Sequence, residues 1–125
     1  MLQAFVGKQR IRWSVDEVAL PVKQGMSLAV LINELVNNAV KHGGHQVDLR
    51  LAMVETDVTL EVCDDGPGFA QAFSHATAAN FGLELVESIG RLELGGETTY
   101  RNRPEGGACV RMTFPVPAMQ VALAS

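Results

Sequence analysis

The sequence has little positive charge, little cysteine and no long hydrophobic run, and each of these absences excludes a class of function. Lysine and arginine together number 10, against 14 aspartate and glutamate residues, so the formal net charge is −4 at pH 7. Proteins that bind nucleic acid without sequence preference usually present a basic face. We therefore expect no nucleic-acid partner, and any phosphate that the chain binds must be recognised locally.

The two cysteines, Cys63 and Cys109, are far apart in the chain. They lack the paired spacing of a zinc site or of a redox motif. We expect both to be buried, reduced thiols on strands.

No run of apolar residues reaches the length of a membrane span, and the first residues lack the uninterrupted apolar core of a secretory signal. We expect a soluble, cytoplasmic domain without membrane contact. A chain of 125 residues with 47% hydrophobic content can bury one core but not two. We place that single domain at residues 11–117, after a leftover or linker segment at 1–10 and before a flexible tail at 118–125.

Hydrophobic periodicity divides the chain into strands, where apolar residues alternate, and helices, where they recur every three or four residues. In chain order the pattern predicts an edge-like strand at 10–15, a helix at 21–42, strands at 47–53 and 58–62, a mobile lid at 70–80, a helix at 81–94, and strands at 98–102 and 108–115. The consecutive strands should pair as hairpins. This order favours helices gathered on one face of a mixed, mostly antiparallel sheet, which is an α/β two-layer sandwich.

Three polar side chains, Glu34, Asn38 and Lys41, fall on one side of the first predicted helix, within an arc of roughly 60° that borders its apolar face. A solvated helix edge would have the same pattern, with Glu34 and Asn38 sharing a hydrogen bond. Asn37 and Asn38 in mid-helix favour a functional interpretation, because asparagine is a poor helix former that competes with the backbone for hydrogen bonds. A carboxylate, an amide and an amine in this arrangement suit a metal-bound phosphate.

Asp64 ends the second strand of the first hairpin, and Gly66 and Gly68 follow at alternate positions. A strand end holds the carboxylate rigidly, while glycine lets the backbone approach a flat ligand closely. A purine amino group is a natural hydrogen-bond donor to such an acid. An ordinary hairpin exit also contains Asp-Gly and Pro-Gly dipeptides, so this motif is not specific by itself.

The second predicted helix opens at residues 80–83, Asn-Phe-Gly-Leu. Free backbone N–H groups and the helix dipole make a helix start a site for anions, although every helix start has these groups. The order and spacing of the three motifs are more specific than any one of them.

Taken together, the three motifs resemble those of the GHKL superfamily. Residues 33–43 resemble its N box, residues 64–69 its G1 box and residues 82–86 its G2 box. Three further features, Leu94-Gly95-Gly96, Gly106-Gly107 and Phe114-Pro115, resemble sensor histidine kinases, especially those related to the HWE group. The resemblance spans residues 11–116 and implies a Bergerat-type fold that binds ATP and Mg²⁺ as the catalytic domain of a two-component kinase.

The resemblance also implies a role for each motif residue. Asn38 would coordinate the Mg²⁺ that bridges the phosphates, and Lys41 and His42 would contact phosphate oxygens. Glu34 would be the general base or polarising group. The remaining ATP-binding residues are Asp64 as acceptor for the adenine amino group, Gly66 and Gly68 as the floor beneath the base with Phe69 beside them, and Gly82 and Leu83 on the lid and phosphate side. These roles suit phosphoryl transfer, which needs charge neutralisation and alignment more than covalent chemistry from the protein.

Two positions depart from the family pattern. Asn80 stands where a glycine is often found in the second glycine box, which puts lid closure and phosphate affinity in doubt. Ala108 follows Gly107 where threonine is common, so one solvent-mediated adenine contact is expected to be missing.

None of His42, His45 and His75 lies in the pattern expected of a phosphoacceptor helix. We expect the acceptor histidine to lie on a separate dimerisation segment of the parent kinase, with a response regulator as the next partner. An anti-sigma-factor-type serine kinase and a degenerate GHKL binding or phosphotransfer module are the alternatives. The interval from Phe69 to Gly82 is too short for the lid of the DNA gyrase and MutL ATPases.

Overall fold

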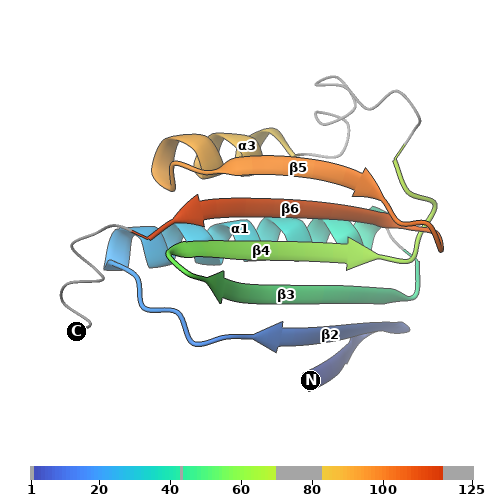
Figure 1. The fold of residues 1–125 in the computed structure, drawn as a ribbon. Coiled ribbons are helices and arrows are strands. Elements are labelled where there is room, and N and C mark those ends of the chain that lie inside the picture. The colour runs from blue at the N-terminus through green and yellow to red at the C-terminus, as the bar shows by residue number, and fades with distance from the viewer. Residues whose placement is uncertain (1, 43, 70–82, 117–125) are drawn as a thin grey trace.

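A computed structural model describes residues 2–42, 44–69 and 83–116 of the chain. Within these ranges six strands form one sheet in the order β1-β2-β3-β4-β6-β5, and α1 lies across one of its faces (Figure 1). The strands are β1 (Leu2–Val6), β2 (Gln9–Val15), β3 (Gln46–Val54), β4 (Asp57–Asp64), β5 (Glu97–Asn102) and β6 (Ala108–Pro115). The helical segments are α1 (Val22–His42), α3 (Glu84–Ser88) and the π-helix η1 (Ile89–Glu93). The predicted two-layer α/β arrangement is confirmed.

Strands β2 and β3 are parallel, whereas every other pairing in the described sheet is antiparallel. The parallel pair follows from α1, which carries the chain back across the sheet between the two strands. Strand β1 pairs with β2, so the expectation that β2 is an edge strand is wrong. Residues 2–6 therefore join the sheet, while the division of the chain at residues 10 and 117 stays a prediction.

Helix α1 has the limits that its apolar periodicity predicts. The Pro21 carbonyl accepts a hydrogen bond from the Gly25 N–H at the start of the helix. Side chains three or four residues apart are buried on the face toward the sheet, namely Leu28, Leu31, Leu35 and Ala39. They pack against inward-facing residues of β3, β4 and β6, and the fully buried members of this core include Val47, Val58, Leu60, Met112 and Phe114.

The second helical segment differs from the single helix predicted at 81–94. Val86 is fully buried, but Leu92, two three-residue steps further along, is 72% exposed, and Leu94 is buried instead. The cause is η1, in which the Leu94 N–H donates to the Ile89 carbonyl, five residues back, and so turns the chain out of helical register. Gly90 lies against β6, where a Cβ would come within 2.0 Å of the Met112 side chain.

Both predicted hairpins are present. Strands β3 and β4 pair with Val47 opposite Asp64, and β5 and β6 pair with Asn102 opposite Ala108. The predicted lid at 70–80 and the predicted tail at 118–125 lie outside the described residues.

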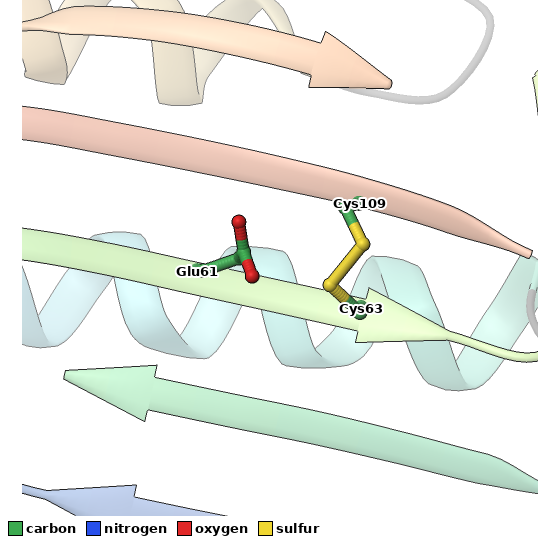
Figure 2. A group of neighbouring side chains, drawn as sticks. All are labelled: Glu61, Cys63 and Cys109. Carbon is green, nitrogen blue, oxygen red and sulfur yellow. A yellow bond between two sulfur atoms is a disulfide. The ribbon is translucent and has the colours of Figure 1, made fainter. Parts of the chain in front are cut away.

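The two cysteines form a disulfide, so the expectation of reduced thiols is wrong. Strands β4 and β6 are neighbours, and their register places Cys63 directly opposite Cys109, with a Cα–Cα distance of 4.1 Å. Both side chains leave the sheet on the face away from α1 (Figure 2). The cysteines are 46 residues apart in sequence, and only the pairing of β4 with β6 brings them together.

Candidate nucleotide site

A small pocket lies between the C-terminal half of α1 and the ends of β4 and β6. Its walls come from both layers, namely Leu35, Asn38, Ala39, Val62, Asp64, Gly68, Phe69, Ala108 and Val110. Its free volume is about 20 Å³, which is room for one water molecule. A purine would therefore require the side chains around it to move.

Asp64 is the polar centre of this pocket, and it is only 8% exposed. One carboxylate oxygen accepts the Gly66 N–H at 2.8 Å and the Ala108 N–H at 3.4 Å. The second oxygen accepts no hydrogen bond from the residues that the structure describes. A buried carboxylate needs hydrogen bonds to offset its lost hydration. The second oxygen is therefore suited to accept an N–H from a ligand.

Two glycines let the backbone close around Asp64. Gly107 has φ +111°, and a Cβ there would lie 1.8 Å from the Asp64 carbonyl oxygen. Gly68 has φ +82°, and a Cβ would meet the Asn102 side chain at 2.8 Å. Gly107 therefore requires glycine on steric as well as conformational grounds, because its contact is with backbone. At Gly68 the positive φ favours glycine, and a side chain would also displace Asn102.

Asn102 holds the segment after Asp64 in place, a role that sequence reasoning missed. Its Oδ1 accepts the Phe69 N–H at 2.7 Å, and its Nδ2 donates to the Phe69 carbonyl at 3.0 Å. The Phe69 ring packs edge-on against Tyr100, with ring centroids 5.9 Å apart. Burial raises the pKa of Tyr100 far above its usual value, and its hydrogen bond to Glu87 raises it further, so the phenol stays a donor to that carboxylate.

Asp65 and Arg103 also position the site without lining the pocket. One Asp65 oxygen accepts the N–H groups of His45 and Gln46, which fixes the start of β3 beside the end of β4. Arg103 donates to the Asp64 carbonyl at 3.3 Å. Asp65 was visible in the sequence as the second acid of an Asp-Asp pair, whereas no local pattern marks Arg103.

The structure brings only part of the predicted site set together. Asn38, Asp64, Gly68 and Phe69 line one pocket, and the Gly66 N–H binds Asp64. Glu34 is half-buried and Lys41 is exposed, and neither is among the residues that line the pocket. The Leu83 side chain is fully buried in the core, and its place on the lid and phosphate side stays a prediction. The structure does not describe the side chain of His42, and Asn80 and Gly82 lie outside the described residues.

The amino-acid sequence matches the model of a family described as histidine kinase-, DNA gyrase B- and HSP90-like ATPase, over residues 24–118. The chain belongs to this family. The matched range contains every motif that sequence analysis singled out. The match confirms the ATPase family that the motifs predict, a family that includes histidine kinases, and with it the Bergerat fold.

Named relatives agree with this assignment. The chain is 30% identical to the signal transduction histidine-protein kinase AfsQ2 of Streptomyces coelicolor, over 81% of the chain and 23% of that protein. It is 39% identical to the sensor protein KdpD of Escherichia coli, over 69% of the chain and 11% of that protein. Among solved structures, the ATP-binding domain of PrrB from Mycobacterium tuberculosis superposes with a TM-score of 0.73 at 26% identity, covering 90% of the chain and 84% of that domain. The chain therefore spans under a quarter of the first two relatives, and the HWE-related grouping stays a prediction.

None of the described helices is long and apolar enough to cross a membrane.

Proposed function

We propose that this domain binds ATP with the adenine amino group on Asp64, and that it serves as the kinase module of a longer two-component sensor protein. The observation that carries the proposal is the buried Asp64 carboxylate, which has one oxygen held by backbone N–H groups and the other without a partner among the described residues. The walls beside it are apolar, as a purine ring requires, and they include Val62, Ala108 and Val110.

The helix α1 supplies the phosphate end of the proposed site. Asn38 lines the pocket, and Lys41 lies one turn further along and is exposed, so its ammonium is free to reach phosphate oxygens. Glu34 lies one turn before Asn38 and is the proposed general base or polarising group. His42, at the end of the same helix, is a further proposed phosphate contact.

The residues present fit a magnesium ion shared with ATP. The half-buried Asn38 amide makes no side-chain hydrogen bond to described residues, so its oxygen is available as a hard ligand. When bound, the ion neutralises phosphate charge during transfer. No carboxylate cage is required, because Mg²⁺ in such sites keeps several waters and the phosphate oxygens as ligands.

We infer that the γ-phosphoryl group goes to a histidine on a separate dimerisation segment, and from there to a response regulator. The relative AfsQ2 is named a histidine-protein kinase, which favours a histidine acceptor over the serine acceptor of an anti-sigma-factor-type kinase. The small free volume of the pocket is the observation that favours a degenerate module instead.

Calorimetric titration with a non-hydrolysable ATP analogue, with and without Mg²⁺, tests the nucleotide site. A hydrogen bond to a charged group contributes about 1.5–3 kcal/mol, so Asp64→Asn should weaken binding at least about tenfold. Asp57→Asn, at the exposed start of the same strand, is the matched control and should bind like the wild type. A GTP analogue should bind poorly, because guanine presents a carbonyl where adenine presents the amino group.

Three results would test the proposal and its parts. Absence of binding at millimolar nucleotide, with a native circular-dichroism spectrum, would favour the degenerate module. Equal affinity for the ATP and GTP analogues would contradict the role of Asp64. Loss of the Mg²⁺ dependence in Asn38→Ala, with retention in Asn38→Asp, which keeps an oxygen ligand, would support the metal assignment.

A further inference from the structure

The face of the sheet away from α1 holds a second chemically distinctive group, the Cys63–Cys109 disulfide (Figure 2). It lies in a hollow of about 410 Å³ whose lining includes Cys63, Arg101 and Arg103. Cys63 is 8% exposed and Cys109 only 1% exposed. Cys63 is thus the more exposed residue of the pair, and of the two cysteines it is the one that lines the hollow.

The charges around the disulfide are balanced. Glu61 forms ion pairs with Arg111 at 3.0 Å and with Arg101 at 3.7 Å. Arg103 forms ion pairs with Glu105 at 2.8 Å and with Asp48 at 3.7 Å. The described carboxylates that line the hollow, Asp48, Glu61 and Glu105, are therefore all paired with arginines, although the chain as a whole carries a net charge of −4.

Glu61 and the two sulfur atoms also lie within 4.8 Å of one another, close enough to suggest a metal site. We favour redox chemistry over metal binding for two reasons. The sulfurs are bonded to each other, and metal ligation requires free thiolates. The Glu61 carboxylate is already paired with two arginines.

The strand ladder would keep the two thiols together after reduction. Cys63 and Cys109 are directly opposite as the last pair of a continuous antiparallel register, next to the pairs Val62–Val110 and Glu61–Arg111. Their Cα–Cα distance of 4.1 Å matches the closer of the two spacings in an antiparallel ladder, at which opposed side chains approach each other. Re-formation of the bond needs no rearrangement of the backbone.

The disulfide is also one residue away from the nucleotide pocket on both strands. Cys63 precedes Asp64, and Cys109 follows Ala108, whose N–H donates to Asp64. Because neighbouring strand residues face opposite sides, the sulfurs lie on the outer face while Asp64 and Ala108 line the pocket. The bond thus holds together the two strand ends between which the Asp64 carboxylate is fixed.

We propose that Cys63 and Cys109 form a reversible thiol–disulfide site that takes a dithiol reductant and that tunes nucleotide affinity at Asp64. A thiolate of the reductant attacks the Cys63 sulfur, which forms a mixed disulfide and releases the Cys109 thiolate to take up a proton. The second thiol of the reductant then attacks the reductant's first sulfur in the mixed disulfide. This closes the reductant's internal disulfide and releases the Cys63 thiolate. Two electrons pass to the cysteine pair, and the reductant leaves as a disulfide. The link to affinity rests on the proposed ATP site.

Equilibration of the 125-residue protein in mixtures of reduced and oxidised dithiothreitol, followed by acid quenching and mass spectrometry of alkylated cysteines, tests the redox site. The oxidised fraction should follow a two-electron curve that is the same from either direction, with an unchanged far-ultraviolet circular-dichroism spectrum. A bond that excess reductant opens only under unfolding conditions would overturn the proposal, as would thiols that stay reduced in oxidised dithiothreitol.

Two single variants test the assigned direction of attack. In Cys109→Ala the remaining Cys63 should react with glutathione disulfide at least about tenfold faster than Cys109 does in Cys63→Ala, because exchange depends on access to the sulfur. Equal rates in two folded variants would contradict the assignment of Cys63 as the entry point.

Nucleotide titration of the oxidised and reduced protein tests the coupling. We expect the oxidised form to bind the ATP analogue about threefold more tightly, and by linkage saturating analogue should make the disulfide harder to reduce by about 14 mV. Equal affinities would overturn the coupling. Absence of binding in both forms would refute the ATP proposal instead, while the redox titration would still report on the disulfide.

Discussion

The two faces of the sheet are formed by the same strands but differ in chemistry. On β4, Leu60, Val62 and Asp64 face α1, and Asp64 ends the strand. Glu61 and Cys63 face the other side. Among the described residues, the buried part of the covered face is apolar apart from the Asp64 carboxylate at its end. The outer face carries ion pairs and a disulfide. Stability should therefore depend mainly on the covered face, while the outer face should respond to pH and redox conditions.

Neighbouring substitutions in β4 test this contrast most strongly. Leu60 is fully buried, so Leu60→Ala should lower the free energy of unfolding by about 2–5 kcal/mol through lost burial and a cavity. Glu61→Ala removes ion pairs with exposed arginines and should cost at most about 1 kcal/mol. Urea denaturation of both variants measures the difference. Similar losses would mean that the two faces contribute equally.

Reduction of the disulfide should have the next largest effect. A disulfide that closes a loop of this length typically contributes 2–4 kcal/mol, chiefly by restricting the unfolded chain. We expect a lower melting temperature in reducing buffer, with no change in the double variant Cys63→Ala, Cys109→Ala, which serves as the control. An unchanged melting temperature for fully reduced wild-type protein would contradict this.

Loss of the Asn102 side chain should affect the ligand more than the fold. Asn102→Ala removes two hydrogen bonds to the Phe69 backbone, each contributing about 0.5–1.5 kcal/mol. The segment after Asp64 should loosen, and ATP-analogue affinity should fall about tenfold. The matched control is Asn37→Ala on the exposed side of α1. Equal affinities of the two variants would show that the segment is held by other contacts.

Local patterns predicted much of the fold. The spacing of Leu28, Leu31, Leu35 and Ala39 marks α1, and alternation marks both hairpins, because each of these signals lies within one short segment. The pairing of β4 with β6 joins residues 46 positions apart at the disulfide, and no local pattern contains it. The π-helix η1, in which Leu92 is exposed, is likewise not predicted by the periodicity of an α-helix.

The candidate site divides in the same way. Asp64 and Asn38 were found from their positions at a strand end and on a helix face, and the structure places both on one pocket. Asn102 and Arg103 escaped prediction because their hydrogen-bond partners lie more than thirty residues earlier in the chain. Contacts of that range depend on strand register, which the hydrophobic pattern of a single strand does not specify.

The smallest expected effect concerns pH and the outer face. Burial alone would raise the pKa of Asp48, but hydrogen bonds from Arg12 and Gln46, together with the charges of Arg12 and Arg103, hold it below its usual 3.8. A carboxyl whose pKa is lower in the folded state contributes stability that is present above pH 3.8 and is lost as the pH falls below it, through the folded pKa. Asp48→Asn should therefore lower stability slightly at pH 7 and flatten its decline in acid. Urea denaturation midpoints at pH 7 and pH 3 measure the loss of stability and its pH dependence, with Asp57→Asn at an exposed position as the control. An equally steep decline in Asp48→Asn and wild type would assign the acid sensitivity to other carboxylates.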